Sequence, residues 1–109
     1  MSISTHVLDT MRGIPAAGLS VRLDRREPNG DWKEMGEGVT DSDGRVPQLS
    51  EDELDAGEYR LEFDTGPYFE RSGLDPFYPS IAVAFNFDGG NLHVPLLLTA
   101  YGYSTYKGT

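Results

Sequence analysis

Several features common in proteins are missing from this sequence, and each absence excludes a class of function. The 109 residues contain no cysteine, which excludes disulfides, thiolate metal ligands and a cysteine nucleophile. No apolar run approaches the roughly 20 residues of a membrane span. Residues 1–6 carry neither the basic nor the apolar segment of a signal peptide. We therefore expect a cytoplasmic protein with no membrane partner.

Positive charge is also scarce. Lysine and arginine together number 9 against 18 aspartates and glutamates, for a net charge of −9. This balance argues against nucleic acid as a partner, because basic patches supply most of the affinity for phosphates. On such an acidic surface, a local cluster of histidine, arginine and lysine would be well suited to an anionic or strongly polar ligand.

The length and the pattern of the chain predict one all-β domain over residues 1–109. Thirteen glycines and seven prolines separate short runs in which apolar and polar residues alternate, as in antiparallel sheets. Seven or eight strands with turns at this spacing favour a β-sandwich. The predicted strands are 3–8, 19–24, 32–39, a short one from 45, then 58–63, 80–87, 93–98 and 101–106.

Three local signals refine this pattern. Ser50 and Glu53 have the spacing of a capping box, which predicts one helical turn over 51–54. The best candidate for a short helix is 68–72, between Gly66-Pro67 and Gly73. Pro95 lies inside an apolar strand although proline cannot donate to a ladder. We therefore expect Pro95 at an edge, at a bulge, or where the sheet faces a cavity or a partner.

Few residues of this sequence are equipped for chemistry. His6 and His93 are the two histidines, and they cannot by themselves supply the three protein ligands of a typical catalytic zinc site. Taken singly, each histidine is compatible with a structural role. No nucleophile elbow and no phosphate-binding glycine loop is present. Asp41-x-Asp43-Gly44 is interpreted as an ordinary turn rather than a calcium loop. We expect no metal and no other cofactor.

Taken together, the motifs resemble those of the transthyretin-like protein family over essentially the whole chain. The ending resembles the C-terminal signature of the 5-hydroxyisourate hydrolases within it. The segments that carry the resemblance are Thr5-His6-Val7-Leu8-Asp9-Thr10, Gly13-Ile14-Pro15-Ala16, Thr40-Asp41-Ser42-Asp43-Gly44-Arg45, Phe77-Tyr78-Pro79, His93-Val94-Pro95-Leu96-Leu97-Leu98 and Tyr103-Ser104-Thr105-Tyr106-Lys107-Gly108-Thr109.

The resemblance implies a transthyretin-like (prealbumin-like) β-sandwich of two four-stranded sheets with one short helix. It also implies a homotetramer, a dimer of dimers, with active sites in the channel where the dimers meet. The implied reaction is hydrolysis of 5-hydroxyisourate in urate degradation. The family's two histidines match His6 and His93, its arginine matches Arg45, and its C-terminal tetrapeptide matches residues 106–109.

This chain departs from the family at four positions. The tetrapeptide is usually Tyr-Arg-Gly-Ser, so Lys107 replaces a planar guanidinium and Thr109 replaces a serine. Leu92 and Ala100 stand where the family tends to have an aromatic residue and a proline. These departures bear on affinity more than on the type of reaction.

A site hypothesis follows. 5-Hydroxyisourate opens spontaneously in water, so its catalyst needs to position and deprotonate a water and to stabilise an oxyanion, without a covalent nucleophile. The catalytic residues are then His6, Arg45 and His93, with either histidine as the base and arginine holding the substrate. The predicted substrate-binding residues are His6, Arg45, Ser104, Tyr106, Lys107 and Thr109.

Two other interpretations remain open at this point. The first is a non-catalytic small-molecule carrier on the same sandwich, like the transthyretins that bind thyroid hormone, which resemble this chain in fold but lack the histidines, the arginine and the tetrapeptide. The second is an immunoglobulin-like accessory module. Such a module would not explain a polar, aromatic C-terminal segment.

Overall fold

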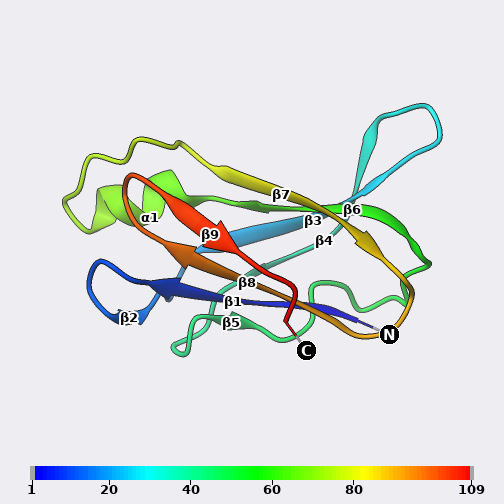
Figure 1. Cartoon of the computed structure of the whole chain (residues 1–109), viewed down its shortest axis with the longest axis horizontal. Coiled ribbons are helices and arrows are strands. Elements are labelled where there is room, and N and C mark those ends of the chain that lie inside the picture. Colours follow the sequence, from blue (N-terminus) through cyan, green and yellow to red (C-terminus); the bar gives the residue numbers. More distant parts are fainter. Residues whose placement is uncertain (1, 109) are drawn as a thin grey trace.

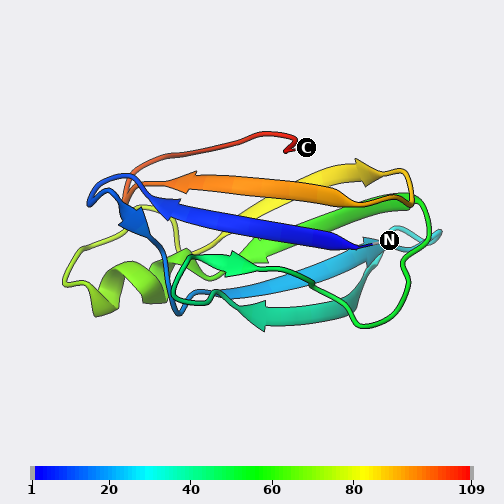
Figure 2. The same cartoon turned by 90° about the horizontal axis from the view of Figure 1, so that it is seen from below.

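The computed structural model describes residues 2–108 as two β-sheets packed face to face (Figures 1 and 2). The prediction of an all-β sandwich with one short helix is confirmed. The first sheet contains β1 (Ile3–Asp9), β2 (Ile14–Pro15), β5 (Arg45–Val46), β8 (Leu92–Leu98) and β9 (Tyr103–Thr105). The second contains β3 (Ser20–Arg26), β4 (Trp32–Val39), β6 (Gly57–Phe63) and β7 (Ile81–Phe87). Helix α1 (Thr65–Arg71) lies at the opposite end of the sandwich from the start of β1 (Figure 1).

The first sheet has five strands but is four strands across, in the order β2-β1-β8-β9. The two-residue strands β2 and β5 both pair with β1, β2 at Leu8 and Asp9 and β5 at Thr5 and His6. They share one edge of β1 because β8 occupies the other edge. The β1–β8 pairing is parallel and joins the start of the chain to a strand near its end.

Alternation explains why these segments form strands with one buried face. In β1 every second residue, from Ile3 to Asp9, is buried, whereas Ser4, His6 and Leu8 are half-buried on the outer face. β6 buries Tyr59, Leu61 and Phe63 in the same way. Each fully buried Leu or Phe contributes roughly 1.5–3 kcal/mol to folding. The core therefore lies between the sheets, and the outer faces remain available to bind ligands or partners.

Three predicted elements differ clearly from the structure. α1 begins at Thr65, three residues earlier than predicted, because Pro67 falls in the first turn, where a missing N–H costs nothing. The helical turn predicted at 51–54 is wrong. There the Ser50 hydroxyl accepts the N–H of Asp52 at 3.2 Å, closing a local turn instead. The predicted strand 101–106 is shortened to 103–105, because Thr99 N–H donates to the Gly102 carbonyl and makes a turn.

Pro95 lies in β8, between β1 and β9, where the second pairing is interrupted. β9 pairs with Leu96, Leu97 and Leu98, and pairing resumes only at the bridge between His93 and Gly108. Because N–H groups alternate in direction along a strand, the nitrogen of Pro95 faces the gap. The missing donor therefore falls where no ladder bond is made, which agrees with the expectation for this proline.

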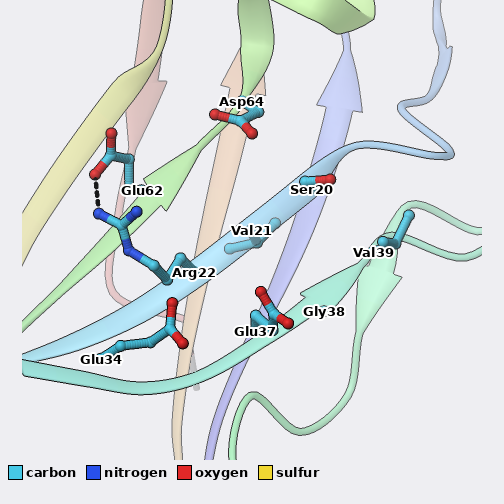
Figure 3. A pocket seen from close by; sticks show the side chains of 9 residues that line it. All are labelled: Ser20, Val21, Arg22, Glu34, Glu37, Gly38, Val39, Glu62 and Asp64. Atoms are coloured by element: carbon cyan, nitrogen blue, oxygen red, sulfur yellow. Dashed lines mark hydrogen bonds and ion pairs between the residues drawn. The ribbon is translucent and has the colours of Figure 1, made fainter.

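The outer face of the second sheet is charged, and its charges are paired. Asp24 is buried and accepts hydrogen bonds from Arg22 Nε at 3.0 Å and from the Arg60 guanidinium at 2.8 Å. Burial opposes ionisation of Asp24, but these bonds outweigh it and lower its pKa. Arg22 also pairs with Glu62, as Figure 3 shows beside a hollow of about 450 Å³.

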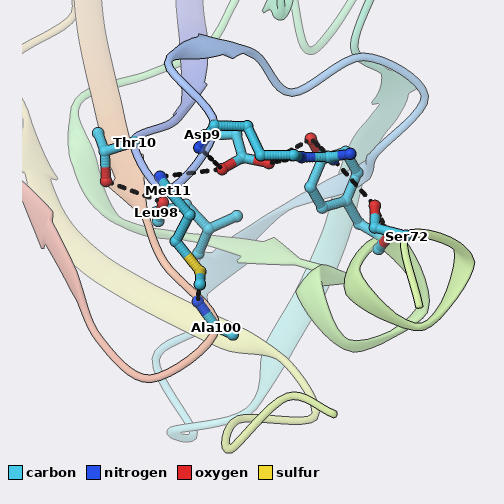
Figure 4. Close-up of polar contacts among 8 residues, drawn as sticks. Asp9, Thr10, Met11, Ser72, Leu98 and Ala100 are labelled. Atoms are coloured by element: carbon cyan, nitrogen blue, oxygen red, sulfur yellow. Dashed lines mark hydrogen bonds and ion pairs between the residues drawn. The ribbon is translucent and has the colours of Figure 1, made fainter. Parts of the chain in front are cut away.

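A buried carboxylate ties the end of β1 to the helix (Figure 4). Asp9 accepts hydrogen bonds from Arg12 Nε and from the Tyr68 hydroxyl, each at 2.9 Å. Arg12 in turn donates to Ser72 at the end of α1. Burial raises the pKa of Asp9, but these hydrogen bonds outweigh it, so its pKa is lowered.

Among residues 2–108, no helix is long and apolar enough to cross a membrane.

Candidate active site

The outer face of the first sheet brings the three predicted catalytic residues together. His6 on β1 is directly opposite Arg45 on β5. Along the parallel pair of β1 and β8, Ser4 is opposite His93, so His6 lies two residues further along. The two imidazole rings are 6.4 Å apart between centroids. Residues 87 positions apart in the sequence thus become neighbours because β1 and β8 pair.

His93 is half-buried on β8, beside Ser4 of β1. Its Nδ1 lies 2.9 Å from the Ser4 hydroxyl oxygen. Burial, and then the nearby charges of His6 and Arg45, lower the pKa of His93 below its usual 6.5. The ring is therefore neutral at neutral pH and able to accept a proton.

Gly108 holds the C-terminal segment against His93. Its N–H donates to the His93 carbonyl at 2.8 Å. A Cβ atom at Gly108 would lie 2.8 Å from the ring carbon Cδ2 of His93, which is closer than side chains approach in proteins. Only glycine therefore lets the chain pass so near the histidine.

His6 is oriented by the turn that carries Arg45. Its Nε2 lies 2.9 Å from the Asp43 carbonyl oxygen. A carbonyl only accepts, so this nitrogen carries a proton, and the lone pair of the neutral ring is on Nδ1. The Asp41 carboxylate accepts the N–H groups of Asp43 and Arg45 at 2.9 and 3.0 Å, which closes the predicted turn. The Arg45 bond is the largest cause that lowers the pKa of Asp41.

An open cavity of about 510 Å³ lies beside Arg45 and His93, and His6 does not line it. Arg45, His93 and Ser4 line it together with Leu92 and Asn91. Within residues 2–108 the side chain of Arg45 makes no ion pair, unlike Arg22 beside the hollow of Figure 3. A guanidinium with unused donors and a neutral imidazole thus face one cavity.

The predicted substrate-binding residues of the C-terminal segment lie further away within the single chain. Ser104 pairs with Leu97, four residues along β8 from His93, or about 13 Å at the usual rise per residue. Tyr106 and Lys107 line a separate, mostly apolar groove of about 330 Å³ beside β7. Thr109 lies outside the described residues. Of the last four residues, Gly108 is the one that the structure shows in contact with His93.

Sequence reasoning missed two residues of this site, Ser4 and Asp41. Alternation along the first strand places Ser4 on the same face as His6, and that signal could have identified it. The prediction of an ordinary turn at Asp41 is confirmed, but no sequence pattern reveals that its carboxylate accepts the N–H groups of both Asp43 and Arg45. Within residues 2–108, no three His, Asp or Glu side chains gather closely enough to hold a metal ion.

Chemically, this arrangement is suited to moving a proton and holding a polar ligand. A neutral imidazole can deprotonate a water, and a guanidinium can hold a carbonyl oxygen as negative charge develops on it. Two of the hydroxyls in the same region are already engaged with backbone carbonyls. Those of Thr5 and Thr105 donate to the carbonyls of Val94 and Pro95.

Comparison with known proteins points to one family. The model of the HIUase/Transthyretin family matches residues 3–108. A 5-hydroxyisourate hydrolase of Salmonella typhimurium is 46% identical over 110 residues, which are 98% of this chain and 80% of that protein. The solved Klebsiella pneumoniae 5-hydroxyisourate hydrolase has a TM-score of 0.89, with 34% identity and 100% of both chains covered. Sea bream transthyretin in complex with thyroxine has a TM-score of 0.93, with 29% identity, 99% of this chain and 95% of that one covered.

Proposed function

This chain belongs to the HIUase/Transthyretin family, and we propose that it is an enzyme that hydrolyses 5-hydroxyisourate in urate degradation. The product is 2-oxo-4-hydroxy-4-carboxy-5-ureidoimidazoline. The observation that carries the proposal is the register that sets His6, Arg45 and His93 side by side on one outer face. Between them, a histidine can deprotonate a water and the arginine can hold the developing oxyanion.

In the proposed mechanism, His93 is the general base. Its lowered pKa keeps it neutral, and with Nδ1 near Ser4 its Nε2 is left for the water. Nε2 takes a proton as the water oxygen bonds to a ring carbonyl carbon. Arg45 donates to the developing oxyanion. The carbon–nitrogen bond then breaks, and the protonated His93 returns its proton to the leaving nitrogen. The carboxylic acid that forms loses its own proton to the solvent and becomes a carboxylate.

His6 has the supporting role in this proposal. Its Nε2–H is engaged by the Asp43 carbonyl, so the lone pair on Nδ1 can accept an N–H of the substrate ring. Such a contact would hold the flat ring at a fixed angle to His93. Orientation of this kind lowers the barrier without any covalent intermediate.

The proposal includes a homotetramer, a dimer of dimers, that completes the site. Support comes from the open form of the cavity and from Tyr106, which is 60% exposed although it belongs to the predicted binding segment. Packing a second copy on this face would enclose the substrate and bring Ser104, Tyr106, Lys107 and Thr109 within its reach. We also propose a cytoplasmic location, in keeping with the cysteine-free composition.

The fold similarity to sea bream transthyretin keeps one alternative, a small-molecule carrier. A carrier would need a cavity for its ligand but no base of lowered pKa beside an unpaired arginine. The pair of His93 and Arg45 therefore favours the hydrolase.

The first experiment is the decay of 5-hydroxyisourate, generated in situ from urate by uricase and followed by near-ultraviolet absorbance. The chain is assayed with a free C-terminus and with a C-terminal tag. We expect accelerated decay that the tag weakens, because the last residues belong to the site. Decay at the spontaneous rate with folded, untagged protein would refute the hydrolase and favour the carrier.

Light scattering tests the assembly separately. A tetramer is expected at micromolar concentration. A fully active monomer would show that the site needs no second copy.

A further inference from the structure

Ser4 lies beside the proposed base, and its hydroxyl takes no part in the proposed proton transfers. Ser4 is the residue of β1 opposite His93, and its Oγ lies 2.9 Å from His93 Nδ1. The same oxygen lies 3.5 Å from the carbonyl oxygen of Leu92, the residue before His93. Ser4 thus bridges the backbone and the ring of one short segment of β8.

The two contacts of Oγ set the possible positions of the protons. The Ser4 hydroxyl has one proton, which can go to the Leu92 carbonyl at 3.5 Å or to Nδ1 of His93 at 2.9 Å. When the hydroxyl donates to the carbonyl, the lone pairs of Oγ accept the Nδ1–H of His93. A neutral imidazole carries one proton, so with Nδ1 protonated its lone pair is on Nε2. Within residues 2–108, Nε2 has no protein hydrogen-bond partner.

We propose that Ser4 is the positioning residue of His93, whose hydroxyl accepts Nδ1–H and so keeps the basic lone pair on Nε2. This inference rests on the proposed function, in which His93 deprotonates the water. When Nε2 takes that proton, the Nδ1–H bond to Ser4 remains in place. The ring therefore passes from imidazole to imidazolium and back without turning, and Ser4 itself neither gains nor loses a proton.

Other hydroxyl groups near His93 are unsuited to this role. The Thr5 hydroxyl is buried in the opposite face of β1 and donates to the Val94 carbonyl at 2.6 Å. Ser104 lies about 13 Å away along β8, at the usual rise per residue. Ser4 is thus the hydroxyl that the described residues place on the ring.

Four variants test the proposal. Ser4→Ala removes the hydroxyl. Ser4→Thr and Ser4→Val introduce side chains of the same shape, and both residues suit a strand. Only threonine keeps the hydroxyl. Ser42→Ala is the control, because it removes an exposed hydroxyl that contacts neither histidine. Far-ultraviolet circular dichroism and thermal melting establish that each variant folds.

The first measurement is the tautomer of His93 by long-range ¹H–¹⁵N NMR at pH 8. The chain contains only two histidines, so His93 is assigned by comparison with a His6→Asn variant. We expect the Nδ1–H tautomer in the wild type, Ser4→Thr and Ser42→Ala. In Ser4→Ala and Ser4→Val we expect the Nε2–H tautomer to appear, because nothing then holds the proton on Nδ1. A wild-type tautomer in both hydroxyl-free variants would overturn the proposal.

The second measurement is the rate of 5-hydroxyisourate hydrolysis. In Ser4→Ala and Ser4→Val we expect kcat to fall about five- to tenfold, the scale of one hydrogen bond, with KM nearly unchanged. Ser4→Thr should retain the wild-type kcat. Wild-type kcat in the hydroxyl-free variants would overturn the proposal whatever their tautomer. If the wild type itself is inactive, the proposed function fails, and the tautomer alone then decides whether Ser4 orients His93.

Discussion

The two outer faces of the sandwich both carry charged residues beside a hollow of similar size, but they use them differently. On the second sheet, Arg22 and Arg60 are paired with Asp24, and Arg60 also lies over the Trp32 ring at 4.4 Å. On the first sheet, Arg45 makes no ion pair within residues 2–108, and each histidine has only one ring nitrogen engaged. Charges that are already paired stabilise the fold, whereas unpaired donors and acceptors are available to a ligand.

This difference in pairing marks the outer face of the first sheet as the one available to bind a ligand. The hollows measure about 450 Å³ on the second sheet and about 510 Å³ on the first, so size alone does not distinguish them. His93, which is a neutral base, lines the hollow on the first sheet. The comparison predicts that matched substitutions on the two faces will have opposite effects on activity and on stability.

The largest effect is expected from His93→Asn, because asparagine keeps a polar side chain but cannot take a proton near neutral pH. We expect kcat to fall about 100-fold or more, the usual scale of general acid–base catalysis. The assay is the uricase-coupled decay of 5-hydroxyisourate. Glu34→Gln, beside the hollow of the second sheet, is the control and should leave the rate unchanged. Full activity of a folded His93→Asn protein would exclude His93 as the base.

An Arg-to-Lys substitution on each face tests whether the two arginines differ in function. Arg45→Lys keeps the charge but loses the planar fork, so we expect about a tenfold fall in kcat/KM. Because Arg45 has no ion pair to lose within the described chain, the melting temperature should not change.

Arg22→Lys should do the reverse. It loses fixed contacts with Asp24 and Glu62, but its side chain is 40% exposed, so the loss of stability should stay below about 1 kcal/mol. Activity should be that of the wild type. A fall in activity for Arg22→Lys as large as for Arg45→Lys would mean that the two faces do not differ in function.

Much of this contrast between the two faces could be predicted from the sequence, because successive side chains of a strand point to opposite sides of the sheet. A strand with period two places Ser4 and His6 on one face and buries Ile3 and Thr5 on the other. Resemblance to the family supplied the roles of His6, Arg45 and His93. The structure adds that the three meet on one face.

What could not be predicted depends on contacts between distant residues. No local pattern reveals that β1 pairs in parallel with β8, or that Ser4 therefore reaches Nδ1 of His93. The failed helical turn at 51–54 shows the same limit at short range. Ser50 has two ways to use its hydroxyl, and a single helical turn has too few bonds to compete with a local turn.

A smaller effect is expected where the C-terminal segment crosses the first sheet. In Gly108→Ala the new methyl group would lie 2.8 Å from His93 Cδ2, so the ring or the segment must move by a few tenths of an ångström. We expect kcat/KM to fall about fivefold, since misplacement by a whole ångström costs far more. Gly102→Ala is the matched control, because its methyl group would meet nothing closer than 3.7 Å. Equal rates for the two variants would show that the segment does not orient His93.

The smallest effect is a shift in the titration of His93, measured by NMR. Burial, His6 and Arg45 all disfavour the charged ring, so the wild-type pKa should lie below 6.5. Arg45→Gln removes one positive charge and should raise the pKa, but not to 6.5, because burial remains. Because the folded pKa is lowered, the fold gains stability above pH 6.5 and loses it as the pH falls through the folded pKa. Arg22→Gln, on the paired face, should leave the pKa of His93 unchanged; an equal shift in both variants would mean that His93 senses net charge rather than its neighbours on the first sheet.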